Sequence, residues 1–343
     1  MARQIVISKA GGPEVMVDRE APHEAVPAGH VRIKVAAAGV NFADVVGRLG
    51  NYPDAPPIPY CPGYEVSGTV SEVGAGVAEL SVGARVCALV KFGGYADEVI
   101  ARSEGVFPLP DGVELIAASA IPVTYLTAHT CLFDAGALVR GKSVLVMGGA
   151  GGVGSAAVQL LRNTGIKVIS TAGSSAKCDW LRAQGVEHAI NYNEEDVAAA
   201  VKTATGGRGV DAVLDPMGGR SLSASVAMCA PLGRVISYGV SAMNPGKTRS
   251  ILAMAREGLP MRFFNLIPLF GANVGIHGIN MLALAEADPQ LMRVKMAEIL
   301  AKVAKGELAP VVAERYALDA KGAAQAHHYL QDRKNIGKVV LVR

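Results

Sequence analysis

Apolar and polar residues alternate over short stretches in the first third of the chain, a pattern typical of β-strands. Gly, Pro, Asn and Asp clusters separate these stretches, as turns between strands would require. The runs between about residues 3 and 122 are RQIVIS, HVRIKVAAAGV, YEVSGTVSEV, ARVCALV and ADEVIA. They predict an irregular, mostly antiparallel β domain.

After Thr124 the rhythm changes to apolar strands that alternate with helical stretches, the pattern of a parallel sheet with crossover helices. The expected strands are 143–148, 167–172, 189–192, 210–215 and 234–239, and the expected helices are 153–163, 176–184, 195–203 and 222–228. Right-handed crossovers make this an α/β, Rossmann-type doubly wound sheet. A helix over 290–305, a strand near Tyr316, a helix over 321–331 and a final strand KVVLVR follow, and we expect them to complete the first domain.

Residues 263–285 contain no Asp, Glu, Lys or Arg over a length that could span a bilayer. Asn, Pro, His and Gly residues interrupt both the helix and its apolar character. We therefore expect no transmembrane segment, and predict a loop and a short strand that line something apolar.

A glycine-rich turn follows the first strand of the predicted parallel sheet. VLVMGGAGGVG contains the spacing G-x-G-x-x-G between an apolar strand and a helix. Gly149 permits the tight turn, Gly151 leaves room for a pyrophosphate, and Gly154 lets the helix lie close to the strand, while amides near Gly152 and Val153 face the anion. A glycine turn without a ligand is the alternative, which five surrounding βα units make the weaker one.

The end of the second strand indicates which dinucleotide is preferred. NAD-binding sheets place an acidic residue there, but this chain has TAGSS, and its next carboxylate is Asp179 inside the following helix. Next to Gly173, Ser174 and Ser175 instead offer hydroxyls at a helix N-terminus. Lys177 adds a positive charge and Tyr192 a phenol, so these residues could bind a 2′-phosphate. These residues predict that the cofactor is NADPH. The alternatives are that Lys177 is only a solvated lysine on a helix face and that Tyr192 only packs at the end of a strand.

Composition narrows the remaining classes. The 33 Lys and Arg against 30 Asp and Glu give a net charge of +3 with no basic stripe, which excludes an electrostatic footprint for nucleic acid. The five cysteines include no C-x-x-C pair, and the first fifteen residues lack the apolar run of a signal peptide. We expect a cytoplasmic protein.

Several motifs resemble the medium-chain dehydrogenase/reductase superfamily, specifically its zinc-free quinone oxidoreductase branch. They are AGVNFADVVGRLGNYP, PGYEVSGTVSEVGAGV, GGYADEV, VLVMGGAGGVGSAAVQL, DPMGG and NIGKVVL, and the C-terminal third is also similar to the vesicle amine transport protein group. The resemblance implies a GroES-like β-barrel catalytic domain formed by residues 1–124 and 284–343, and a Rossmann domain formed by residues 125–283.

The resemblance also implies where the chemistry takes place. Zinc-dependent relatives carry Cys at the position of Asn41 and His at that of Tyr64. We therefore expect neither a tetrahedral zinc site nor any other metal ligand in this chain. The residues matching the family's nicotinamide and substrate neighbourhood are Asn41, Asp44, Tyr52, Tyr64, Thr127 and Gly239, and Asn335 could close over the cofactor.

Roles for these residues follow from hydride chemistry. Asn41 could bind the cofactor or polarise a substrate carbonyl, and Tyr52 could orient the acceptor or deliver a proton. The alternatives are a turn residue for Asn41, a helix-cap or ion-pair residue for Asp44, and a buried phenol for Tyr64. Core packing for Thr127 and a plain turn for Gly239 also remain open.

The expected activity is NADPH-dependent, metal-free hydride transfer to a small apolar electrophile, a quinone or an α,β-unsaturated carbonyl compound. Alternatives are a non-catalytic nucleotide-binding or lipid- or membrane-associated protein of the same fold, and an enoyl-thioester reductase. The loop 263–279 would cover the substrate or join two subunits, and by analogy with the family we expect a homodimer. The loop would offer Phe264, Leu266, Ile267 and Phe270 to an apolar acceptor.

Overall fold

The computed structural model describes residues 2–21, 23–262 and 265–343, and divides the chain into two compact units. Unit 1 comprises Met1–Leu126, Gly246–Arg249 and Met281–Arg343, and unit 2 comprises Thr127–Pro245 and Ser250–Asn280. The sequence analysis expected residues 1–124 and 284–343 in one domain and residues 125–283 in the other; unit 1 additionally contains Gly246–Arg249.

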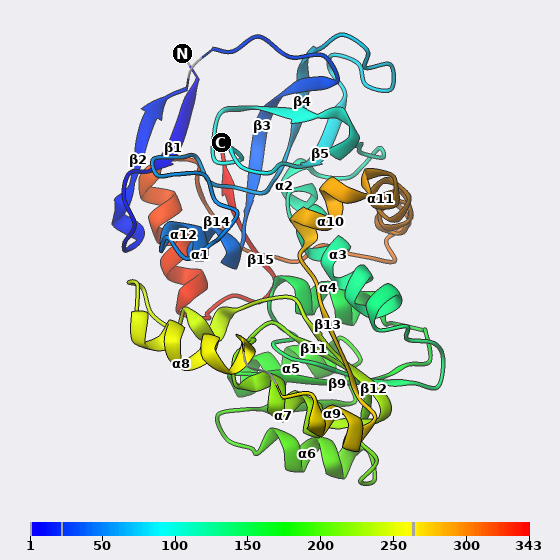
Figure 1. Cartoon of the computed structure of the whole chain (residues 1–343). Helices are drawn as coiled ribbons and strands as arrows, with labels where there is room; N and C mark the ends of the chain where they lie inside the picture. Colours follow the sequence, from blue (N-terminus) through cyan, green and yellow to red (C-terminus); the bar gives the residue numbers. More distant parts are fainter. Residues whose placement is uncertain (1, 22, 263–264) are drawn as a thin grey trace. The chain divides into compact units, whose positions relative to one another are not determined.

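Unit 1 is built on a seven-stranded sheet with the order β14-β15-β3-β4-β5-β7, to which β6 adds by pairing with β3 (Figure 1). All its pairings are antiparallel except that of β14 with β15, and β1 and β2 form a separate antiparallel pair. The five strand runs of the sequence correspond to β1, β3, β4, β5 and β6, so the antiparallel β prediction is confirmed. The strands are β1 (Arg3–Ile7), β2 (Met16–Glu20), β3 (His30–Val40), β4 (Glu65–Val73), β5 (Arg85–Leu89), β6 (Glu98–Arg102), β7 (Val106–Pro108), β14 (Val312–Ala317) and β15 (Lys338–Val342).

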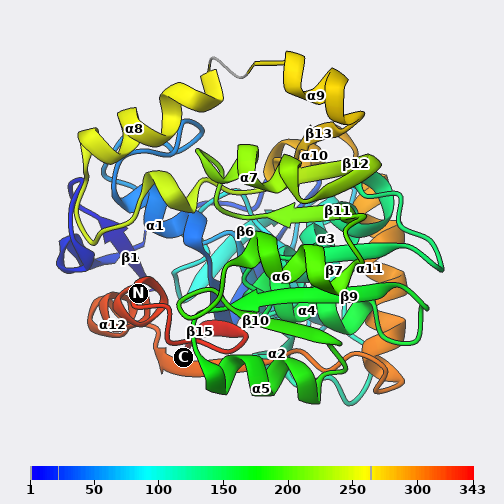
Figure 2. The ribbon, with the colours of Figure 1, turned by 90° about the horizontal axis from the view of Figure 1, so that it is seen from below.

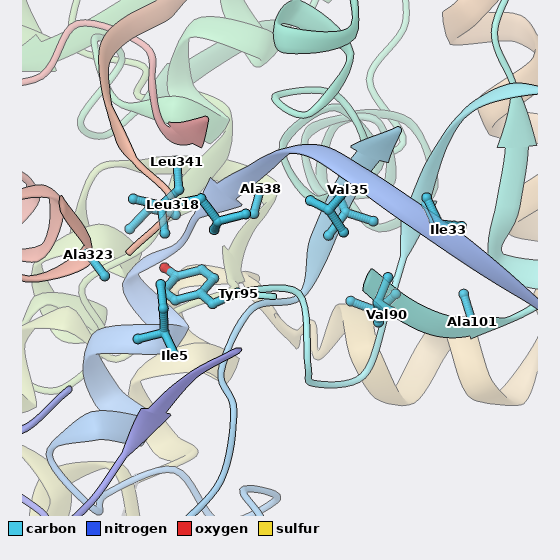
Figure 3. Close-up of a cluster of buried hydrophobic side chains, with 14 of the residues drawn as sticks. Ile5, Ile33, Val35, Ala38, Val90, Tyr95, Ala101, Leu318, Ala323 and Leu341 are labelled. Carbon is cyan, nitrogen blue, oxygen red and sulfur yellow. The ribbon is translucent and has the colours of Figure 1, made fainter. Parts of the chain in front are cut away.

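The core of unit 1 forms where these strands present aliphatic side chains to one another. Figure 3 shows Ile33 and Val35 of β3 in one cluster with Leu341 of β15 and Ala323 of α12 (Ala320–Gln331). The C-terminal helix and strand therefore pack into the core of unit 1. The other helices wholly in this unit are α1 (Phe42–Arg48), α2 (Leu115–Ala118), α10 (Met281–Ala287) and α11 (Pro289–Ala304), and the division between the units falls inside α3 (Pro122–His129).

Unit 2 contains a parallel sheet with the order β10-β9-β8-β11-β12-β13, which is the Rossmann order (Figure 2). The doubly wound α/β prediction is confirmed, with β13 as an additional sixth strand. Its strands are β8 (Ser143–Val146), β9 (Lys167–Ala172), β10 (His188–Asn191), β11 (Val210–Asp215), β12 (Cys229–Ser237) and β13 (Gly275–Gly278). The helices are α4 (Gly152–Leu160), α5 (Ser175–Ala183), α6 (Val197–Ala204), α7 (Ser221–Ala227), α8 (Ile251–Arg262) and α9 (Ile267–Ala272).

The strand order places one turn at the reversal point of this sheet. β8 lies between β9 and β11, and the chain leaves β8 toward one side and later returns to the other. Ligands of such sheets bind beyond the carboxyl ends of the strands at this point. The turns after β8, β9 and β11 are therefore the part of unit 2 where a nucleotide would bind.

The prediction of a loop and short strand for residues 263–285 was partly wrong. The strand is present as β13, but Ile267–Ala272 forms α9 and Met281–Ala287 forms part of a helix, α10. Pro268 lies in the first turn of α9, where its missing N–H costs nothing, and Asn273 ends this helix in the left-handed conformation with φ 53°. No helix among the described residues is long and apolar enough to cross a bilayer.

Candidate functional site

The turn between β8 and α4 has the geometry of an anion-binding site. Gly151 is the N-cap of α4, and it has no side chain that could accept hydrogen bonds from the first-turn amides. The N-caps of α5 and α6, by contrast, are Ser174 and Asp196, whose side chains accept backbone N–H bonds. The predicted residues Gly152, Val153 and Gly154 form this uncapped first turn.

The three glycines of the motif are required for different reasons. A Cβ on Gly149 would clash with the hydroxyl of Ser170, and a Cβ on Gly154 would clash with the carbonyl oxygen of Gly148. A Cβ on Gly151 would lie 3.3 Å from that same carbonyl oxygen and close to no other described atom. The packing of the chain thus accounts for Gly149 and Gly154, whereas Gly151 keeps open the space that a pyrophosphate would need.

Four predicted residues meet at the end of β9. The Ser174 hydroxyl caps α5 by accepting the Lys177 N–H at 3.4 Å, and a Cβ on Gly173 would clash with the Tyr192 hydroxyl. Tyr192 is 38% exposed, and the amide of Asn193 donates to the Gly173 carbonyl at 2.8 Å. The structure therefore brings Gly173, Ser174, Lys177 and Tyr192 together around one helix start.

Sequence reasoning missed one carboxylate at this position. The Ser175 hydroxyl donates to the exposed carboxylate of Glu194 at 3.5 Å, although 19 residues separate the two. Asp179, the carboxylate that the sequence did point to, pairs with Arg182 at 2.7 Å. Only the pairing of β9 with β10 could have revealed Glu194, because the loop after β10 returns to the start of α5.

Asp215 fixes the loop that follows β11. Its carboxylate is fully buried and accepts the N–H of Met217 at 2.7 Å and the N–H of Gly218 at 3.0 Å. It also accepts hydroxyl hydrogens from Ser221 at 2.7 Å and Ser225 at 2.9 Å. Four hydrogen bonds thus satisfy this buried carboxyl group and tie it to the loop and to the start of α7.

Gly239 and Thr127 also belong to unit 2. A Cβ on Gly239 would lie 2.5 Å from the carbonyl oxygen of Pro216, so the loop after β11 explains this glycine without a cofactor. Thr127 lies in α3 and is 5% exposed.

In unit 1, Asn41 is the centre of a buried polar group. The Lys338 ammonium donates to Asn41 Oδ1 at 2.5 Å and forms an ion pair with Glu65 Oε1 at 2.5 Å. Asn41 Nδ2 donates to Glu65 Oε1 at 3.0 Å and to the Gly39 carbonyl at 3.4 Å. Both amide hydrogens are thus engaged, and Oδ1 accepts a hydrogen bond from the Lys338 ammonium.

Asp44 is a fully buried carboxylate that fixes the start of α1. Its Oδ2 accepts the N–H of Asn41 at 2.8 Å, and its Oδ1 accepts the N–H of Gly63 at 2.9 Å. Burial raises the pKa of Asp44 to about 7, against the lowering effect of these N–H donors and of the Lys338 charge. The geometry is that of a helix-capping residue, one of the two roles the sequence left open for Asp44.

Four aromatic rings lie close to one another in unit 1. The Tyr52 and Tyr64 centroids are 6.0 Å apart, those of Tyr64 and Phe92 are 5.3 Å apart, and those of Tyr60 and Phe92 are 5.5 Å apart. Burial raises the pKa of the Tyr52 phenol, with further contributions from Asp54 and Asp44, and burial likewise raises the pKa values of Tyr60 and Tyr64. These phenols are therefore protonated at neutral pH and can donate hydrogen bonds.

Tyr60 was not singled out by the sequence. Its hydroxyl is buried and has no hydrogen-bond partner among the described residues. Nothing in the run IPYCPG distinguishes this tyrosine from a packing residue. Tyr64 is 3% exposed, the buried phenol that the sequence analysis gave as its alternative role.

Asn335 is buried in unit 1, just before β15. Its Nδ2 donates to the Gly337 carbonyl at 2.8 Å, so the side chain shapes the turn that leads into the strand. Of the apolar residues predicted for loop 263–279, Phe264 lies outside the described residues. Leu266, Ile267 and Phe270 are 60%, 73% and 79% exposed.

Within the part of the chain that the structure describes, no three His, Cys, Asp or Glu residues cluster so that they could hold a metal ion. At the two positions where zinc-dependent relatives carry ligands, this chain presents an amide that is engaged by Lys338 and Glu65 and a buried phenol. The donors there do not suit zinc.

Two family models match this chain. Residues 27–111 match the alcohol dehydrogenase GroES-like domain, and residues 152–281 match the model described as zinc-binding dehydrogenase. The GroES-like part of the fold prediction is thereby confirmed for unit 1.

Curated proteins match over nearly the whole chain. The synaptic vesicle membrane protein VAT-1 homolog of Rattus norvegicus is 34% identical over 99% of this chain and 84% of its own length. The quinone oxidoreductase of Rattus norvegicus is 32% identical over 100% of this chain and 98% of its own length. A mycobacterial protein solved in complex with NADPH is 30% identical, covers 100% of both chains, and has a TM-score of 0.87.

Proposed function

Because this chain belongs to the medium-chain dehydrogenase/reductase superfamily and to its quinone oxidoreductase branch, we propose that it is an NADPH-dependent reductase of quinones or α,β-unsaturated carbonyl compounds. The observation that carries the proposal is the turn after β8, where Gly151 keeps open the space beside an uncapped helix start. A full-length structural relative bound to NADPH supports the same cofactor.

Residues of unit 2 would hold the cofactor. The amides of Gly152, Val153 and Gly154 would bind the pyrophosphate, and Ser174, Lys177 and Tyr192 would surround the 2′-phosphate. From the resemblance to the family, Thr127, Gly239 and Asn335 are the proposed neighbours of the nicotinamide. When bound, NADPH supplies a hydride to the acceptor.

We propose that no metal takes part, since an amide and a phenol replace the ligands of the zinc-dependent relatives. The acceptor must then be electrophilic by itself, which favours quinones and enones over simple carbonyl compounds. Reduction of a quinone by one hydride needs one further proton, and the half-buried, protonated Tyr52 phenol is the proposed donor.

The contacts of Asn41 refine its proposed role. Because both of its amide hydrogens are engaged, Asn41 is not suited to polarise a substrate carbonyl. Its Oδ1 is an acceptor, and this chemistry fits the carboxamide N–H of a nicotinamide. We therefore assign Asn41 to cofactor orientation, Tyr52 and Tyr64 to the acceptor, and Asp44 to the support of both.

The test is the decay of NADPH absorbance with a panel of a para-quinone, an ortho-quinone, an enone and an enoyl thioester. We expect turnover with a quinone or the enone, and a reduced turnover number in Tyr52→Phe with unchanged thermal unfolding. Tyr316→Phe, which removes a phenol hydroxyl elsewhere in unit 1, is the matched control. Activity with the enoyl thioester alone would replace the proposal with the thioester reductase.

A non-catalytic binder is the second candidate, which the similarity to the vesicle protein favours. NADPH binding by calorimetry without turnover of any acceptor would support it, and co-sedimentation with lipid vesicles would identify the membrane-associated form. The cytoplasmic location and the homodimer are further parts of our proposal. Cell fractionation and sedimentation velocity test them.

A further inference from the structure

Four buried polar side chains of unit 1 form a continuous chain of hydrogen bonds. Arg48 Nη1 lies 3.4 Å from His327 Nδ1, His327 Nε2 lies 3.3 Å from the Tyr95 hydroxyl, and that hydroxyl lies 3.2 Å from Asp44 Oδ2. All four residues are fully buried. The sequence analysis singled out only Asp44, because Tyr95 and His327 are distant from it in the chain.

The chemistry of the donors fixes the direction of every bond in this chain. A guanidinium has only donors, so His327 Nδ1 must be an acceptor and Nε2 carries the hydrogen. Nε2–H then donates to the Tyr95 oxygen, which leaves the Tyr95 O–H to donate to Asp44. Burial, followed by the charges of Arg48 and His328, holds the pKa of His327 well below its ordinary value, which is consistent with a neutral ring.

The surroundings of the chain strengthen these bonds. Figure 3 shows the Tyr95 ring among apolar side chains, including Ile5, Leu318 and Ala323. Such neighbours exclude competing water, and a hydrogen bond to a charged acceptor is stronger in a medium of low polarity. At the far end, Arg48 Nη2 is held by the Gln331 side-chain oxygen at 2.8 Å.

Asp44 transmits this support to the proposed site. It binds the N–H groups of Asn41 and Gly63, and these residues begin α1 and directly precede Tyr64. The two positions that correspond to zinc ligands in the zinc-dependent relatives are therefore joined through one carboxylate. Protonation of one oxygen would remove an acceptor and release one of the two segments.

We infer that Tyr95, His327 and Arg48 are positioning residues, which keep Asp44 ionised and thereby hold Asn41 and Tyr64 in place for catalysis. This inference rests on the proposed function, because it assigns an acid-sensitive support to that site. Arg48 is the cation at the far end of the hydrogen-bonded series, and Tyr95 donates the hydrogen bond that reaches Asp44 directly.

Other groups face Asp44 from the neighbouring segments. Lys338 of β15 is the cation among those named, and its charge opposes protonation of Asp44. Burial raises the pKa of the Cys61 thiol to about 12, and the neighbouring phenols are also protonated at neutral pH. The thiol and these phenols therefore keep their protons over the pH range in which Asp44 titrates. The phenols are those of Tyr52, Tyr60, Tyr64 and Tyr95.

The first test is the pH profile of kcat/KM for NADPH-dependent quinone reduction. Loss of a donor raises the pKa of Asp44, so activity falls at a higher pH as the solution is acidified. We expect Tyr95→Phe to move the acidic limb upward by about one pH unit, which is the size of one hydrogen bond to a charged acceptor. His327→Leu should shift it in the same direction, while His327→Gln, which keeps an acceptor and a donor, should restore the parent profile. Tyr316→Phe is the matched control and should leave the limb unshifted.

An infrared titration reads Asp44 directly, without need of turnover. The C=O band of its protonated carboxyl, identified with isotope-labelled aspartate and by its loss in Asp44→Asn, should appear at a higher pH in Tyr95→Phe than in the parent. Coincident titrations in Tyr95→Phe and the parent would overturn the inference. A shifted titration in a protein that reduces no acceptor would instead keep the support of Asp44 and reject the proposed function.

Discussion

The buried ion pair between Lys338 and Glu65 gives a quantitative test of how unit 1 is held together around Asn41. The two side chains are 4% and 0% exposed, and their charged atoms lie 2.5 Å apart. Glu65 Oε2 also accepts the N–H of Val123 at 2.8 Å, next to the start of α3. One carboxylate thus joins β15, β4, Asn41 and the helix that leads toward unit 2.

The magnitude follows from the opposing energies of burial and attraction. At 2.5 Å and an effective dielectric constant of about 20, the attraction is roughly 6–7 kcal/mol. Desolvation of the two ions costs several kcal/mol each, so the intact pair contributes little net stability. Lys338→Met removes the attraction but leaves the Glu65 charge buried, and it should lower the free energy of unfolding by about 3–5 kcal/mol.

Urea unfolding of unit 1, followed by hydrogen exchange of the β3 and β15 amides, measures this loss. In Lys338→Met/Glu65→Gln the unpaired charge is removed, so we expect the double variant to recover about 2–3 kcal/mol relative to the sum of the single variants. Lys302→Met is the control, because Lys302 pairs with Glu298 at 2.7 Å on an exposed helix face and should cost less than about 1 kcal/mol. The reasoning would be refuted if the losses of unfolding free energy in the two single variants simply added up in the double variant, or if Lys338→Met and Lys302→Met lost equal stability.

Three further predictions concern unit 2. Gly154→Ala should lower the stability by about 1–3 kcal/mol, because the added Cβ overpacks its contact. Gly151→Ala should keep the parent stability but weaken NADPH binding measured by calorimetry. Equal stability losses in the two variants would contradict the different roles assigned to these glycines. Lys177→Ala should raise KM for NADPH far more than for NADH. Glu194→Gln should selectively lower KM for NADPH, because the Glu194 carboxylate lies 3.5 Å from the Ser175 hydroxyl. Equal changes in KM for both cofactors would show that neither residue senses the 2′-phosphate. Although burial opposes it, hydrogen bonds from Arg208, Ser143 and Lys142 hold the pKa of Asp211 below its usual value, so the carboxylate stabilises the protein above about pH 4 and this effect is lost as the pH falls further. In denaturant titrations, Asp211→Asn should therefore destabilise the protein at pH 7 and progressively less below about pH 4. A stability difference that does not depend on pH would argue against the linkage.

Local sequence pattern was sufficient for most elements and failed where the environment decided. β1, β3, β4, β5 and β6 were found because alternation reports one buried face directly. β2 was missed because most of MVDRE is exposed, and α9 was missed because its Pro and Gly residues suggest a break. Pro268 is tolerated only because it lies in the first turn, which a residue count does not reveal.

The candidate site divides in the same way. The glycine turn and the missing acid at the end of β9 were visible because they depend on neighbours along the chain. Glu194, Tyr60 and the contacts of Asn41 were not, because each is set by a residue from another element. The NADPH preference and the positions of Asn41 and Tyr52 are still predictions that the experiments above address.

The sequence alone determined that this chain forms an antiparallel β unit and a parallel dinucleotide-type unit, because periodicity and turn residues act over a few neighbours. The tertiary structure decided which charges lose their water and what replaces it. Lys338 and Glu65 are 273 residues apart, and Asp44 and His327 are 283 residues apart, yet each pair lies in one buried network. Desolvation and pairing depend on distance in space, and no spacing along the chain encodes them.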